Sequence, residues 1–264
     1  MGEQLVDFFV SWFVYPGIKW TSLLVGIGLA FAFGAFWFTL YWTNILKNLR
    51  AWAVLVGSAI FSLAAITFIQ VPLQLWAGDV LGGFWSREVI YRFILLTAIP
   101  QVLLSGFIQE GAKLVPVVVW WWRKGRSIDP MMGLAIGAVA GLGLGVFEAL
   151  WAHNRVFLTG WGWEMVQAQG LMALAPFWER FFTVAIHVGL SALAGYGLAR
   201  GWGWQFYLLA ASLHTLTNYS AVLLVAGLFT VGHVEIYVAV MAVLVTGGVL
   251  WLRWRKTEDV TLEE

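Results

Sequence analysis

The stretch Phe107-Ile-Gln-Glu-Gly-Ala-Lys113 places a carboxylate, Glu110, and an ammonium group, Lys113, inside a hydrophobic run from Phe93 to Trp122. A helix of about 20 apolar residues spans a bilayer core, so this run predicts a membrane-spanning helix. A charge in such a segment costs about 2.5–3.5 kcal/mol on insertion scales, so intramembrane charges face the bundle interior and mark sites. Because Glu110 and Lys113 are three residues apart, we predict that they pair.

The composition is that of a membrane protein. Of the 264 residues, 61% are hydrophobic and 11% are charged, whereas about 25% are charged in an ordinary globular chain. The net charge of +1 argues against nucleic acid as a partner, because nucleic-acid binding requires a basic surface. The chain has no cysteine, which excludes disulfides and thiolate metal sites.

Seven apolar segments predict an all-α, polytopic membrane bundle of about seven transmembrane helices, which forms one integral-membrane domain over residues 1–264. The predicted spans are residues 21–43, 51–77, 93–122, 131–152, 181–199, 205–230 and 236–252. Pro72 is expected to kink or end the second span. Residues 153–177 are expected to form an outer loop or an interfacial piece, with His153 in contact with water.

The fourth span has glycine at every fourth position. Gly133, Gly137, Gly141 and Gly145 form overlapping GxxxG steps. Such steps allow another helix to approach closely. We therefore predict that the fourth span packs tightly against a neighbouring helix.

Basic residues orient the chain in the membrane. With seven spans, nine lysines and arginines lie on one side and five on the other. The side with more Lys and Arg is usually cytoplasmic. The sequence therefore predicts an N-terminus outside the cell and a cytoplasmic tail at residues 253–264.

Polar residues of several spans lie at similar depth. Because a helix rises 1.5 Å per residue, Glu110 and His187 lie roughly 20 Å, and His214 roughly 18 Å, from the cytoplasmic ends of their spans. Glu148 and Asn218 fall about one turn further out, and Asn218 shares a helix face with His214. We therefore predict a polar cavity among spans three to six.

These residue types are suited to hydrolysis, in either of two ways. A buried glutamate can act as a general base, histidine transfers protons or binds metals, and asparagine can donate to an oxyanion. Glu110, His187, His214 and Asn218 could together activate water against a peptide carbonyl. Alternatively, His187, His214 and Glu148 could hold Zn²⁺, with Glu110 as the base.

Four motifs lie in order on successive spans: Gln109-Glu110-x-x-Lys113, Phe147-Glu148, His187, and His214-x-x-x-Asn218. Together they resemble the motifs of the PrsW-like and CAAX-type group of membrane-embedded proteases. The first motif of that group is Glu-Glu-x-x-Lys or Glu-Glu-x-x-x-Arg. The chain departs from it at Gln109, where the group has an acid to which the CAAX branch assigns the activation of water.

The resemblance implies an intramembrane endopeptidase that cleaves membrane-anchored proteins or peptides in a prokaryotic plasma membrane, with a catalytic core at residues 93–230. The catalytic residues that it implies are Glu110, Glu148, His187, His214 and Asn218. Gln109, Lys113 and Arg180 are expected to support them, and Arg180 to pair with Glu148.

Two other functions remain as alternatives. Gln109 favours an inactive protease relative that binds partners. Buried Glu and His residues are also typical of proton-coupled transporters. Transporters, however, usually consist of two matching halves, and the third span, which is interrupted by proline and glycine, has no counterpart later in the chain.

Overall fold

The computed structural model describes residues 2–261, and the side chains of these residues except 45, 46 and 256–261. Within this part the chain is helical and contains no strand. The helices are α1 (Gly2–Ser11), α2 (Trp20–Thr39), α3 (Leu49–Ala65), α4 (Val71–Phe84), α5 (Arg87–Arg92), α6 (Ile94–Thr97), α7 (Ile99–Arg123), α8 (Pro130–Leu158), α9 (Trp163–Gln169), α10 (Ala175–Ala199), α11 (Gly203–Val225) and α12 (Val231–Thr261). Three short helical pieces join them: η1 (Asn44–Lys47), η2 (Ile66–Gln70) and η3 (Gly170–Leu174).

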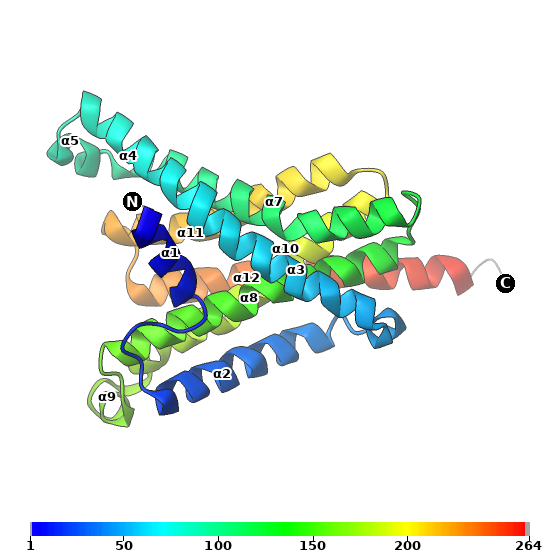
Figure 1. Cartoon of the computed structure of the whole chain (residues 1–264), viewed down its shortest axis with the longest axis horizontal. Coiled ribbons are helices and arrows are strands. Elements are labelled where there is room, and N and C mark those ends of the chain that lie inside the picture. Colours follow the sequence, from blue (N-terminus) through cyan, green and yellow to red (C-terminus); the bar gives the residue numbers. More distant parts are fainter. Residues whose placement is uncertain (1, 262–264) are drawn as a thin grey trace.

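Seven segments are long and apolar enough to cross a membrane, which confirms the predicted fold class. Four are the single helices α2, α8, α11 and α12, and three are composite: α3–η2–α4, α6–α7, and α9–η3–α10. Helix α1 and the last described residues of α12 lie at opposite ends of the bundle (Figure 1). An odd number of crossings has this consequence.

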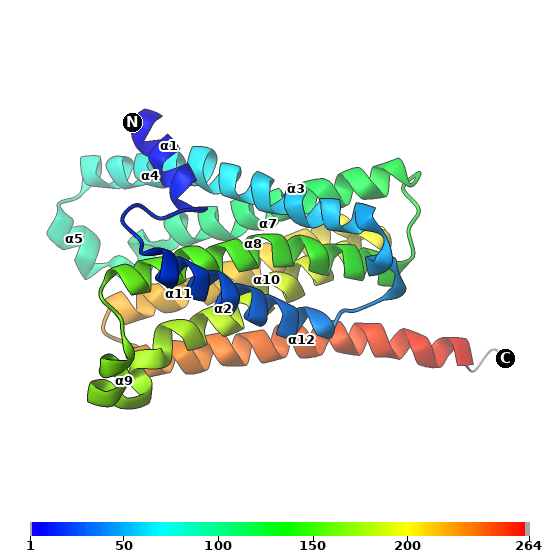
Figure 2. The ribbon, with the colours of Figure 1, turned by 60° about the horizontal axis from the view of Figure 1, so that its bottom comes forward.

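Helices α8 and α10 form the centre of the bundle (Figures 1 and 2). In each of the two spans that contain them, 72% of an apolar stretch of 18 residues is buried inside the protein. In the other five spans the buried share of such a stretch is 33–44%. A Cβ atom on Gly137 would lie 2.1 Å from the carbonyl oxygen of Ser191, and one on Gly141 would lie 2.1 Å from that of His187. The glycines of α8 therefore bring its backbone against that of α10, which confirms the predicted close packing.

The second span continues past Pro72 to Phe84, so of the two predicted effects of this proline, a kink or an end, the end does not occur. Just before the proline, η2 makes one π-helical turn, in which the N–H group of Val71 bonds to the carbonyl of Ile66, five residues back. Proline has no N–H group and crowds the preceding turn, and a π-turn is one way in which a membrane helix accommodates it.

The prediction for residues 153–177 is wrong at its start. Helix α8 continues to Leu158, and His153 is fully buried. Its ring contacts those of Phe33 and Phe177, and its Nδ1 lies 3.4 Å from the carbonyl oxygen of Gly26. The polar residues next to His153 in the sequence do not show that α2 covers this side of α8.

Candidate active site

Glu110 and Lys113 form a buried ion pair on α7, with Lys113 Nζ 2.6 Å from Glu110 Oε1 and neither side chain exposed to solvent. This confirms the predicted pairing. The close approach of α11 positions the pair. A Cβ atom on Gly106 would lie 2.6 Å from the carbonyl oxygen of Ala211, so only glycine allows the two helices to lie this close.

His214 reaches the pair from α11. Its Nδ1 lies 2.6 Å from Glu110 Oε1, the same oxygen that accepts from Lys113. A carboxylate only accepts hydrogen bonds, so Nδ1 carries the proton that is shared. The other oxygen, Glu110 Oε2, is buried and has no partner among the described residues. One carboxylate oxygen is therefore available for a proton, water or a metal.

His187 enters from α10 and joins the pair to Glu148. Its Nδ1 lies 3.3 Å from Lys113 Nζ, and its Nε2 lies 2.5 Å from Glu148 Oε2. Because an ammonium group only donates, Nδ1 accepts and the Nε2–H group donates to Glu148. The ring centroids of His187 and His214 are 5.2 Å apart. The predicted convergence of three spans at one depth is therefore present in the structure.

Arg180 lies at the outer side of this cluster. Its Nη1 donates to Glu148 Oε1 at 3.3 Å, which confirms the predicted pair, and its Nη2 donates to Glu179. Glu148 thus accepts hydrogen bonds from both Arg180 and His187. The Glu148 side chain is 25% exposed, so it connects the buried cluster with the outside of the bundle.

Glu110, His187 and His214 also form a donor group that could hold a metal ion. One ligand atom of each lies within 4.8 Å of the others, and all three residues are buried. Three protein ligands that leave a position open are typical of catalytic zinc sites, and the free Glu110 Oε2 fits this pattern. The metal set proposed from sequence has Glu148 in the place of Glu110.

A family comparison adds to this geometry. Residues 46–247, more than half of the chain, match the model of the PrsW family of intramembrane metalloproteases. The chain belongs to this family. It is therefore an integral membrane protein of a protease family, and the matched region contains the whole charged cluster. A search of curated proteins finds no match, and neither does a search of solved structures.

Gln109 lies where the PrsW-like motif has its first acid, and it faces a different set of partners. Its Nε2 donates to Gln70 Oε1 at 3.1 Å and to Ser105 Oγ at 3.3 Å. Ser105 Oγ also accepts from Asn218 Nδ2 at 2.7 Å. Thus Asn218, at the end of the His-x-x-x-Asn motif, is bonded to this amide network.

Gln70 and Ser105 are members of this network that no sequence motif indicated. Gln70 ends the π-turn of η2 and lies 39 residues from Gln109 in sequence, so no local pattern joins them. For Ser105 a signal existed, because it precedes Gln109 by one helical turn and shares its face. A polar residue one turn from a motif residue is a reasonable candidate for such a network.

Replacing Gln109 by Glu is expected to destabilise this PrsW-family member by about 1–3 kcal/mol, because a carboxylate cannot donate to Gln70 Oε1. The measurement is thermal unfolding in detergent micelles. The matched control is Gln167→Glu, at an exposed position of α9. Equal melting temperatures for the two variants would show that the amide network contributes nothing to stability.

A pocket of about 290 Å³ lies beside the cluster, between α8, α10, α11 and α12. Its lining includes Glu148, Arg180, His187, Thr217 and Asn218. Spans four to seven share this pocket, whereas the sequence predicts a cavity among spans three to six. That cavity stays a prediction.

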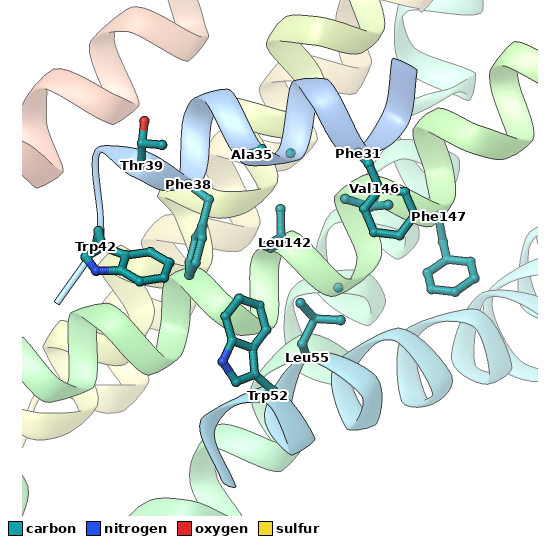
Figure 3. A pocket seen from close by; sticks show the side chains of 12 residues that line it. Phe31, Ala35, Phe38, Thr39, Trp42, Trp52, Leu55, Leu142, Val146 and Phe147 are labelled. Carbon is teal, nitrogen blue, oxygen red and sulfur yellow. The ribbon is translucent and has the colours of Figure 1, made fainter. Parts of the chain in front are cut away.

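A second pocket, of about 300 Å³, lies between α2, α3 and α8 (Figure 3). Aromatic and aliphatic side chains line it, among them Phe38, Trp52 and Leu142. It has no ionisable lining residue among the described residues and therefore offers no group for acid–base chemistry. Of these two pockets, the one at Glu148 and His187 is lined by groups that can transfer protons.

Proposed function

We propose that the chain is an intramembrane endopeptidase that hydrolyses peptide bonds of membrane-anchored proteins or peptides. The observation that carries the proposal is the buried group of Glu110, His187 and His214, with one carboxylate oxygen free beside two imidazoles. The adjoining pocket supports it, because a peptide segment there would lie against His187, Glu148 and Asn218. All these residues are in a core at residues 93–230 of one domain over residues 1–264.

Each residue has a chemical role in this proposal. In the mechanism without metal, Glu110 accepts a proton from the attacking water through Oε2 and passes it to the leaving amine, and Lys113 pairs with the carboxylate. His214 shares the other oxygen of Glu110. Glu148 orients His187, and Asn218 donates a hydrogen bond to the oxyanion of the attacked carbonyl.

The donor group also fits a divalent metal ion, and we propose Zn²⁺. Glu110, His187 and His214 would hold it, which differs from the set His187, His214 and Glu148 by one carboxylate. The ion would supply Lewis-acid polarisation of the peptide carbonyl. Glu148 would then hold His187 in place through Nε2, as carboxylates commonly do for metal-binding histidines.

We propose a prokaryotic plasma membrane as the location, with the N-terminus outside and residues 253–264 in the cytoplasm. The excess of Lys and Arg on one side supports this orientation. Glu148 and Arg180 would then lie in the outer half of the membrane, and cleavage would occur there.

Purified protein reconstituted into liposomes is expected to cleave members of a panel of single-span membrane peptides, with products identified by mass spectrometry. Chelation is expected to reduce the rate at least about tenfold, and added Zn²⁺ to restore it. The negative control is His214→Ala, which removes one imidazole of the Glu110, His187 and His214 donor group.

The outcomes separate the mechanisms. Cleavage by the wild type that a chelator does not affect would support the glutamate mechanism without metal. Failure of a well-folded wild type to cleave any member of a broad panel would favour an inactive relative or a proton-coupled transporter.

A further inference from the structure

Lys113 places a positive charge inside the donor group. Its Nζ lies 2.6 Å from Glu110 Oε1 and 3.3 Å from His187 Nδ1. Glu110 and His187 are two of the three residues that could hold a metal ion. The ammonium group is fully buried, so it cannot turn into solvent without a change in the packing around it.

The hydrogen bonds of His187 show which lone pair of the imidazole the Lys113 ammonium group uses. Nδ1 accepts from Lys113, so its lone pair is directed at the ammonium group, and Nε2 carries a hydrogen toward Glu148. A metal ion binds an imidazole through a lone pair, and this ring has only one. On His187, the lone pair that a metal needs is the one that Lys113 uses.

Glu110 is engaged in a similar way. Oε1 accepts from Lys113 and His214, and only Oε2 is without a partner. The negative charge of the donor group is thus already balanced by Lys113. Two like charges at a few ångströms repel strongly in a buried site, so a divalent ion and the ammonium group in its present place oppose each other.

We propose that Lys113 and a divalent metal ion compete for the lone pairs of Glu110 and His187, so that Lys113 sets the metal affinity of the site. The inference rests on the metal centre proposed above. It differs from a structural zinc site, where metal binding drives folding. Here the metal-free cluster is already paired, because Lys113 leaves no buried charge without a partner.

The test is the Zn²⁺ affinity of metal-stripped protein in detergent micelles, measured by competition with a fluorescent zinc chelator. Lys113→Met is expected to bind Zn²⁺ about tenfold more tightly than the wild type, or more. Lys113→Arg keeps the charge and is expected to bind Zn²⁺ no more tightly than the wild type. Lys124→Met removes the same charge at an exposed site beyond α7 and is expected to leave the affinity unchanged.

Two further variants keep the result decisive. Lys113→Gln is also neutral and can still donate to Glu110, so it replaces Lys113→Met if that variant does not fold. Combining Lys113→Met with His214→Ala is expected to remove the gain, which would locate the bound metal in this donor group.

Equal or weaker zinc binding by both neutral variants would overturn the inference, and so would the absence of zinc binding from every variant. Because the readout is metal binding, it does not depend on peptide cleavage. A wild type that cleaves no peptide would overturn the proposed protease while leaving a positive metal result intact. A wild type that cleaves peptides, together with neutral variants that bind zinc no more tightly than it does, would remove only the role of Lys113.

Discussion

Replacing Glu110 by Gln is expected to lower the rate of peptide cleavage by about 10²–10⁴-fold, the usual contribution of a general base. The amide oxygen of Gln can still accept from Lys113 and His214, so the contacts of the buried pair are retained in part. What is lost is the ability to take a proton from water and, in the mechanism with metal, the negative charge that attracts the ion. The measurement is the initial rate of product formation by mass spectrometry in liposomes.

The control for this prediction is Glu164→Gln, the same chemical change at an exposed position of α9. It is expected to cleave at the wild-type rate. A Glu110→Gln variant that folds and retains cleavage within about tenfold of the wild type would place the activation of water elsewhere. Glu148, which contacts His187 and lines the pocket, would then be the next residue to test.

Replacing Gly141 by Ala is expected to destabilise the protein by about 3 kcal/mol, at the upper end of the usual cost of overpacking. The added Cβ would lie 2.1 Å from the carbonyl oxygen of His187 and 2.7 Å from Cα of Val188. Both are backbone atoms and cannot rotate away, so α10 must move. That movement displaces His187, and cleavage is expected to fall together with the melting temperature.

Gly28→Ala on α2 is the matched control. A Cβ atom there meets nothing within 4 Å. Since Ala favours a helix by about 1 kcal/mol over Gly, this variant is expected to melt at or above the wild-type temperature. Equal melting temperatures for the Gly141 and Gly28 variants would show that α8 and α10 tolerate separation.

The fold was predictable because each membrane span must satisfy a length and a hydropathy requirement by itself. Depth was predictable too, since a fixed rise per residue converts sequence position into distance. Those two rules brought Glu110, His187 and His214 to one level. The spacing of Glu110 and Lys113 on one helix predicted their pairing without any knowledge of the tertiary structure.

What sequence could not provide was the identity of neighbours. Hydropathy gives the length of a span but not which helix covers it, and so the burial of His153 under α2 was missed. The π-turn before Pro72 depends on the packing around it. The hydrogen bond between Gln70 and Gln109 joins two spans. Nothing in the sequence around either glutamine indicates that it has a partner on another span.

The central position of α8 and α10 has a consequence for how the bilayer acts on the protein. Their apolar windows are buried mostly by other helices, whereas the other five spans keep more than half of theirs unburied. A change in hydrocarbon thickness acts on surfaces that touch lipid, by tilting or bending those helices. Such mismatch therefore falls first on the outer helices, and it reaches Glu148 and His187 only through their contacts with α8 and α10.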